Sequence, residues 1–156
     1  MASFWYTKNV QKIVQNTIDL DGDTFKVGLS TATHVPAKNT DEFADDAGAD
    51  DFVDGELSGI SGYTAGFGGA GRKALVNRTV TIPGANPDRV KLDADDLVWT
   101  TLGTGATIKQ ATVLKEVTNN AASPVIVNLD FTGVATTGGD FTLQFHADGI
   151  GYGATA

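Results

Sequence analysis

Alternation of apolar and polar residues is the main pattern along this chain, and it predicts strands. The segment 124–131, PVIVNLDF, places Val125, Val127, Leu129 and Phe131 on one face, as the two-residue period of a strand requires. Similar alternation, or a short apolar run between turn residues, marks 25–30, 74–82, 89–94, 96–102, 107–117 and 141–147. Stretches rich in Gly, Asn and Asp separate these segments and predict turns.

One segment has a helical period instead. Apolar side chains recur at spacings of three and four residues within 5–16, which predicts a short amphipathic helix. Its apolar positions are Tyr6, Val10, Ile13 and Val14. Two interpretations are open: a lid over one end of the core, or an arm that docks on a partner, since Phe4 and Trp5 are large apolar groups near a terminus.

Two regions lack a clear period. Residues 31–72 predict a long loop, acidic in its first half and glycine-rich in its second, with one helical turn started by Thr40. A loop of this length in a compact domain is usually functional or mobile. The glycine-rich segment 148–156 predicts a flexible tail that frays or extends onto a neighbour.

These elements predict an all-β fold. Seven or eight antiparallel strands at regular spacing are typical of a β-sandwich or a jelly-roll-like barrel, here with a short N-terminal helix. A chain of 156 residues with 41% hydrophobic residues suits a single domain spanning 1–156. The chain has no cysteine, which excludes disulfides and thiolate-bound metals. Neither a signal peptide nor a membrane-spanning run is recognisable, so we expect synthesis in a cytosol and no membrane partner.

Charge is unevenly distributed. The net charge is −8, and residues 17–56 hold eleven acids against two lysines, whereas 57–92 hold five bases against one acid. Binding to nucleic acid requires clustered Lys and Arg, often with interleaved aromatic residues. We therefore expect no nucleic-acid partner.

Two acidic clusters are weak candidates for calcium. In DLDGD, the residues Asp19, Asp21 and Asp23 alternate as in a calcium loop, but the glycine and glutamate that an EF-hand needs at its sixth and twelfth positions are missing. A tight turn explains this stretch better.

The second cluster is KLDADDLVWT, where Asp93, Asp95 and Asp96 could form a turn, a cation site or a catalytic pair. Strands are predicted on both sides, and short polar side chains favour turns, so the turn is the preferred interpretation. A catalytic pair would need environments that drive the two pKa values apart, and the sequence indicates none. We expect no catalytic residue and no cofactor.

Two other motifs lack the flanking elements or neighbouring residues that their function requires. Gly66, Gly68 and Gly71 match G-x-G-x-x-G, but a loop precedes them and a strand follows, whereas the dinucleotide motif needs a strand and then a helix. His34 and His146 are far apart in sequence and have no neighbouring ligand motif. We expect both histidines to be exposed or half-exposed.

Three stretches together resemble a family of small virion structural proteins of tailed bacteriophages. They are NTIDLDGDTFKVGLSTATHVP (16–36), VTIPGANPDRVKLDADDLVWTTL (80–102) and TGGDFTLQFHADGI (137–150), and GYTAG (62–66) also fits. Members of this family are typically encoded near the major capsid protein as structural or head-decoration proteins. The chain departs from the family pattern at 44–61, which is longer and more acidic.

The resemblance implies a non-enzymatic capsid decoration (cement) protein. Such a protein is assembled in the host cytoplasm and lies on the capsid exterior of the virion. Its partners are the major capsid protein and neighbouring copies of itself, as a dimer or trimer. The alternatives are a tail, neck or fiber-base component and, from another class, a glycan-binding β-sandwich module. The family offers no catalytic residues to carry over.

A decoration protein needs apolar anchors for its partners. Aromatic side chains are favoured at the centres of such contacts. Our hypothesis is that the anchors are among five aromatic residues outside the regular strand pattern: Phe4, Trp5, Phe43, Phe52 and Tyr152.

Overall fold

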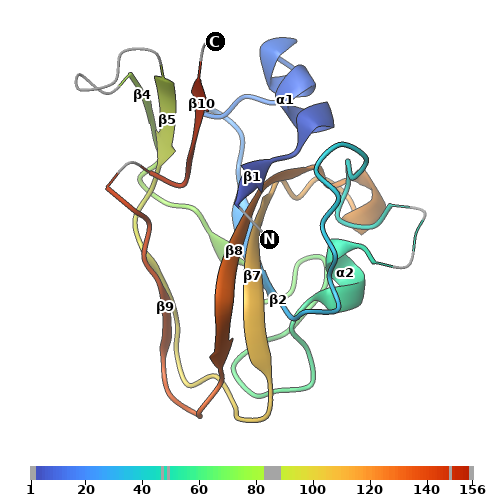
Figure 1. Ribbon diagram of the computed structural model, residues 1–156, viewed down its shortest axis with the longest axis vertical. Helices are drawn as coiled ribbons and strands as arrows, with labels where there is room; N and C mark the ends of the chain where they lie inside the picture. The colour runs from blue at the N-terminus through green and yellow to red at the C-terminus, as the bar shows by residue number, and fades with distance from the viewer. Residues whose placement is uncertain (1–2, 47, 49, 83–88, 148, 155–156) are drawn as a thin grey trace.

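The computed structural model describes residues 3–46, 48, 50–82, 89–147 and 149–154 (Figure 1). The chain is mainly β, with antiparallel sheets and little helix, as the alternation predicts. The elements are β1 Phe4–Trp5, α1 Thr7–Val14, β2 Lys26–Ser30, α2 Phe52–Gly55, β3 Lys73–Ala74, β4 Thr79–Thr81, β5 Arg89–Asp93, β6 Leu97–Trp99, β7 Thr107–Leu114, the 3-10 turn η1 Asn120–Ala122, β8 Val125–Ala135, β9 Phe141–Leu143 and β10 Gly151–Ala154.

The strands form three antiparallel sheets. The largest has the order β1-β8-β7-β2-β3, the second has the order β10-β5-β4, and the third pairs β6 with β9. Figure 1 shows β2, β7 and β8 side by side through the middle of the molecule. The small sheet of β4, β5 and β10 and the helix α1 lie at the same end of the molecule, on opposite sides of it.

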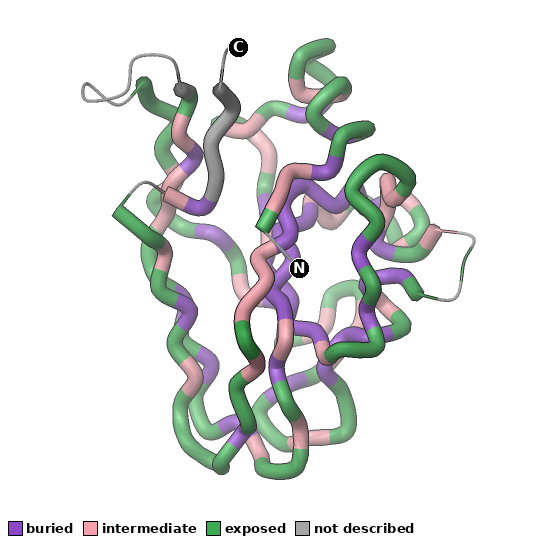
Figure 2. The backbone as a smooth tube through the Cα atoms, viewed as in Figure 1, coloured by how far each residue is buried: buried purple, intermediate pink, exposed green. Residues whose placement is uncertain are grey.

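The core is drawn from all three sheets. Val27 of β2, Ile108 of β7, Leu92 of β5, Trp99 of β6 and Leu143 of β9 belong to one cluster of buried side chains, and buried positions run along the inner strands in Figure 2. Burying so much apolar surface in one cluster is the main favourable contribution to folding.

Strand β2 is buried on both faces, whereas simple alternation predicts one polar face. The second face is covered at Gly28, where the Phe52 ring and the Tyr63 hydroxyl lie so close that a Cβ would collide with the ring and approach the hydroxyl. The missing side chain lets the segment around α2 pack directly on the sheet.

The expected strand 74–82 was predicted incorrectly. It is divided into β3 and β4, and Asn77 between them has φ of 51°, a left-handed conformation that Asn tolerates. Val76, Val80 and Ile82, which the alternation places on one face of the expected strand, are exposed. The physical reason is that β4 is an edge strand that pairs only with β5, so no described layer covers it.

The long loop 31–72 is largely irregular, as predicted, but its one helix lies elsewhere. The helical turn expected at Thr40 does not form, because the amide groups of Thr40 and Asp41 both donate to the Ala37 carbonyl in a tight turn. Helix α2 forms further on, where the Asp54 carboxylate accepts the Asp51 amide at its first turn.

The two remaining corrections concern strand ends. The turn predicted after residue 131 starts too early, because β8 continues to Ala135 and pairs with Thr107 and Ile108 of β7 beyond a shift in register. The prediction of a frayed tail over 148–156 is wrong for Gly151–Ala154, which pairs with Arg89–Leu92 as β10. Residues 148, 155 and 156 lie outside the described part.

A buried ion pair attaches the long loop to the large sheet. The Arg72 guanidinium donates to both oxygens of Glu56, at 2.8 and 2.7 Å, and to Glu116 at 3.0 Å. Glu116 also contacts the Lys26 ammonium at 2.6 Å, and Tyr63 donates to Glu56. The bidentate geometry satisfies the charges of Arg72 and Glu56 together. Because Arg72 also binds Glu116, which pairs with Lys26 of β2, the loop next to Glu56 and Arg72 is held against that strand.

We predict that Arg72→Met destabilises the protein by about 3 to 5 kcal/mol, because it leaves the buried Glu56 carboxylate unpaired. Urea denaturation of the purified variant measures this change. Lys73→Met is the matched control, since the Lys73 side chain has no ion-pair partner among the described residues, and it should change stability by less than about 0.5 kcal/mol. Equal effects of the two substitutions would contradict the structural role of the pair.

Candidate functional site

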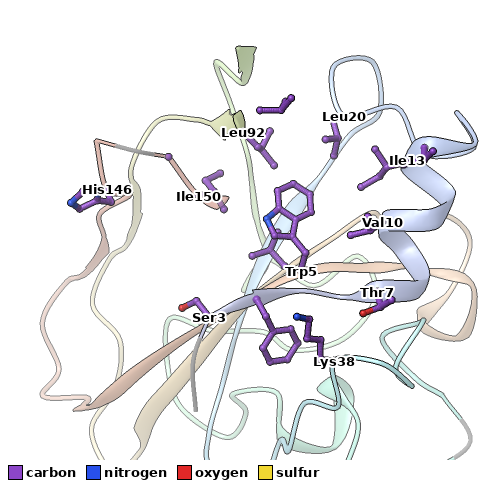
Figure 3. A pocket seen from close by; sticks show the side chains of 15 residues that line it. Ser3, Trp5, Thr7, Val10, Ile13, Leu20, Lys38, Leu92, His146 and Ile150 are labelled. Carbon is purple, nitrogen blue, oxygen red and sulfur yellow. The ribbon is translucent and has the colours of Figure 1, made fainter. Parts of the chain in front are cut away.

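An apolar cleft with a volume of about 910 Å³ lies between α1 and the β10-β5-β4 sheet (Figure 3). Its lining comes from both ends of the chain and from the middle. The lining residues are Ser3, Phe4, Trp5, Thr7, Val10, Ile13, Val14, Leu20, Lys38, Val90, Leu92, Val127, His146, Gly149 and Ile150.

Helix α1 forms one wall of the cleft. Val10, Ile13 and Val14 recur at helical spacing and therefore share one face of α1. Ile13 packs against the core cluster, whereas Val14 is 81% exposed. The apolar face of the helix is thus only partly covered by its own chain.

The small sheet forms the opposite wall. Val80 of β4 pairs with Leu92 of β5, so the two side chains point to the same side of the sheet. Val90, two residues from Leu92, shares that side. Exposure rises along this wall from Leu92, which is in the core, to Val90, which is 44% exposed.

Trp5 forms the floor of the cleft. In Figure 3 its indole lies between Val10 and Ile13 on one side and Leu92 and Ile150 on the other. The indole nitrogen is buried and has no hydrogen-bond partner in the described structure. Since β1 is only two residues long and ends the order of its sheet, Trp5 is held mainly by these apolar contacts.

The cleft contains no carboxylate among its described lining residues, although the protein has a net charge of −8. Its ionisable groups are Lys38 and His146. The Lys38 ammonium forms no ion pair with any described residue, while the Lys38 carbonyl accepts the Thr7 amide and so fixes the start of α1. The surface is therefore apolar with a weakly positive rim.

A second, smaller hollow is acidic. Asp41, Asp46, Asp50 and Asp51 line it together with Lys8. Asp51 is only 7% exposed, and one of its carboxylate oxygens has no hydrogen-bond partner. Burial, and then the negative charge of Asp46 and other nearby acids, raises the pKa of Asp51 to about 6. No three acidic or histidine side chains of the described residues are placed to hold a metal ion.

The first calcium candidate is a turn stabilised by its own carboxylates. Asp19 accepts the Asp21 amide at 3.0 Å, and Asp23 accepts the Asp19 amide at 2.9 Å and the Lys115 ammonium at 2.6 Å. Hydrogen bonds from the Gly22 and Asp21 amides lower the pKa of Asp19. Backbone amides and a lysine thus use oxygens that a cation would need.

In the second candidate, the three acids bind three different neighbours. Asp93 pairs with Lys91 at 2.8 Å, and Asp95 accepts the Asn77 amide nitrogen at 2.6 Å. Asp96 accepts the backbone amide of Phe145 at 2.8 Å. Residues 94–96 connect β5 to β6, as predicted, so this acidic stretch joins β5, β6 and the segment after β9.

The five proposed aromatic anchors have different environments. Phe4 and Trp5 are half-buried in the cleft. Phe43 is half-buried beneath the Lys12 ammonium, which lies 4.3 Å from its ring centre. Phe52 is 2% exposed and packs in the core, so the hypothesis is wrong for this residue. The Tyr152 side chain lies outside the described part of the structure.

His34 was also predicted incorrectly. It is buried rather than exposed, within hydrogen-bonding distance of Ser30, which donates to Gln110. Burial lowers the pKa of His34 to about 4, so the ring is neutral near pH 7. His146 is exposed, as expected. No ligand could reach Ser30 and His34 without opening the core, so this pair supports packing rather than chemistry.

Sequence reasoning missed the cleft and the ion pair of Arg72 with Glu56. The only advance signal of the cleft was the apolar stripe on 5–16, next to Phe4 and Trp5. The sheet wall gave no signal, because its formation by Val90, Leu92 and Ile150 depends on how β5 and β10 pair in the folded chain.

Comparison with known proteins adds no relative: no family model, no curated protein and no solved structure matches this chain. Among the described residues, no helix has the length and apolar character needed to cross a membrane.

We predict that Asp51→Asn stabilises the protein at pH 8, by about 1 to 2 kcal/mol after allowance for solvent screening. Because the folded-state pKa is raised, ionisation of Asp51 costs stability above about pH 6, and this cost disappears as the pH falls toward 4. The stability difference between variant and wild type, measured by urea denaturation, should therefore vanish at pH 4. Asp21→Asn, at an exposed turn, is the control and should show no such pH dependence.

Proposed function

We propose that this protein is a non-enzymatic structural component of a tailed-bacteriophage virion, most specifically a decoration protein on the outer surface of the capsid. The observation that carries the proposal is that the three stretches resembling such proteins converge on the cleft. Leu20 belongs to the first stretch, Leu92 to the second and Ile150 to the third, and all three line this surface. Each of the three stretches thus contributes at least one side chain to this surface.

The chemistry of the surface supports an assembly role. Large apolar surfaces on soluble proteins usually mark contacts with other molecules. The cleft offers such a surface, and the acidic hollow around Asp41, Asp46 and Asp51 offers a contrasting one on the loop between β2 and α2. An acidic surface suits contact with a basic patch of a capsid lattice, and the apolar cleft suits a contact with a neighbouring protein.

We further propose that the sheets act as the two layers of a β-sandwich, with the five-stranded sheet as one layer and the smaller sheets as the other. The shared core cluster, which includes Val27, Leu92 and Trp99, supports this arrangement. The ion pair of Arg72 with Glu56 adds rigidity to the long loop. A rigid scaffold keeps both contact surfaces in fixed positions, which a cement protein requires.

The proposal is tested on particles of the phage that encodes the chain. We expect peptides of this protein in the mass spectrum of purified virions, and cryo-electron microscopy should show its density on the outside of the head. Heads assembled without it should release DNA at a lower temperature and regain stability when purified protein is added.

Density confined to the tail, neck or fiber base would favour the alternative virion role. Absence of the protein from purified particles would refute both. Adding a protein of similar size and charge that does not bind particles serves as the control for the recovery experiment.

A further inference from the structure

We propose that the cleft between α1 and the small sheet binds one aliphatic carboxylate, the anion of a medium-chain fatty acid, with its carboxylate at Lys38 and its chain along α1. The inference goes beyond the proposed function, because it concerns a small molecule inside the cleft. It depends on three features of the described residues: the shape of the cleft, its apolar walls and the position of an unpaired cation.

The cleft extends along the whole of α1, since its lining includes both Thr7 and Val14. Figure 3 shows Lys38 beside Thr7 at one end and Leu20 at the other, with the Trp5 indole between them. The eight residues of α1 span about 12 Å, the length of an extended chain of about ten methylene groups. The volume of about 910 Å³ is within the range of clefts that bind small molecules. The shape of the cleft therefore suits a single chain.

The walls of the cleft favour an aliphatic chain over a polar ligand. They are formed by Val10 and Ile13 of α1, by Leu92 of β5 and by Ile150, above the Trp5 floor. The polar atom of these five side chains, the Trp5 indole nitrogen, is itself buried, so a ligand meets the apolar part of the ring. Methylene groups that fill this surface remove apolar area from water on both molecules. Each methylene that is fully buried should strengthen binding by about fourfold.

Lys38 gives the cleft a preference for an anionic head group. Its ammonium forms no ion pair with any described residue, and its carbonyl accepts the Thr7 amide, so the side chain begins beside the first turn of α1. Lys8 and Lys12 on the same helix are already paired with Glu42, and the described lining contains no carboxylate. A carboxylate at this end thus meets an unpaired cation and no acid of the lining. Because an exposed ion pair contributes little, the chain supplies most of the affinity and Lys38 sets the orientation.

A bound chain is compatible with a protein contact at the same place. Val14 and Val90 are 81% and 44% exposed, so a neighbouring protein can contact them at the rim of the cleft while a chain lies on the floor. Ligand binding is measured on the purified protein, whereas the virion role is measured on particles. The two proposals can therefore fail independently.

The inference is tested by isothermal titration calorimetry with octanoate, decanoate, laurate and myristate, each below the concentration at which it forms micelles. We expect one bound molecule per chain, and an affinity that rises by about tenfold for each two carbons up to laurate. The gain from laurate to myristate should be smaller, because the added carbons extend beyond α1. The emission of Trp5 should shift to shorter wavelength on binding. Trp5→Phe should abolish this shift, since the remaining tryptophan, Trp99, is fully buried in the core.

Matched variants separate the cleft from the rest of the surface. Lys38→Met should weaken laurate binding by about three- to fivefold, whereas Lys73→Met, outside the lining, should leave it unchanged. Val14→Asp places a carboxylate in the lining and should weaken binding by at least about fivefold, whereas Val117→Asp, at an exposed valine outside the lining, should not. Lys38, Val14 and Val117 are exposed, so these variants should fold. Dodecyltrimethylammonium, which has a chain of the same length and the opposite charge, should bind more weakly than laurate, and Lys38→Met should reduce that preference.

Absence of saturable laurate binding overturns the inference, and so does an affinity that rises by the same factor beyond laurate, which indicates general partitioning of the chain. Equal effects of the cleft variants and their controls also overturn it. Binding to vesicles of anionic lipid without binding of free laurate would identify a membrane surface as the occupant, and a neighbouring chain that fills the cleft on particles would identify a protein segment; either result refutes the fatty-acid site. A protein that binds laurate but is absent from virions would refute only the proposed function.

Discussion

The buried pair of Arg72 and Glu56 is the interaction on which the arrangement of this protein depends. The loop between β2 and β3 covers one face of the central sheet, but its sequence is too polar and glycine-rich to be held there by apolar burial alone. The guanidinium fixes it by satisfying Glu56 within the loop and Glu116 after β7 at once. Such pairs stabilise little relative to apolar packing, but they specify one arrangement when every partner is satisfied. The loop contributes Tyr63 and Phe52 to the packing around Gly28, so core packing and the ion pair reinforce each other.

The surface has two chemically different hollows, one acidic and one apolar. On one side, the loop brings several acids together, and burial keeps the Asp51 carboxyl partly protonated near pH 6. On another, α1 and the small sheet diverge above Trp5 and leave apolar side chains exposed to water. The acidic side repels other acidic surfaces, whereas burial of the apolar side against another apolar surface would be favourable. The two surfaces therefore suit different kinds of contact.

The sequence predicted the elements better than it predicted their exposure. Alternation located β2, β5, β6, β7, β8 and β9, and helical spacing located α1, because local periodicity decides which residues share a face. It could not indicate that Val80 and Ile82 face water, since the same alternation would arise beneath a covering layer. Arg72 and Glu56 gave no local signal, because they lie sixteen positions apart in the sequence and meet only after the loop has folded. Of the candidate site, the helix wall and the two aromatic residues before it were recognisable, whereas the sheet wall depends on tertiary pairing.

The buried His34 affects how the whole protein responds to acid. Because its folded-state pKa is lowered to about 4, the unfolded chain takes up a proton first as the pH falls below about 6.5, and this weakens the folded state. Asp51 acts in the opposite direction over much of the same range, since its raised pKa makes the folded state the better proton acceptor. Two buried groups with opposite proton preferences therefore offset each other between about pH 4 and pH 6, so their combined contribution to the pH dependence of stability is smaller than that of either group alone.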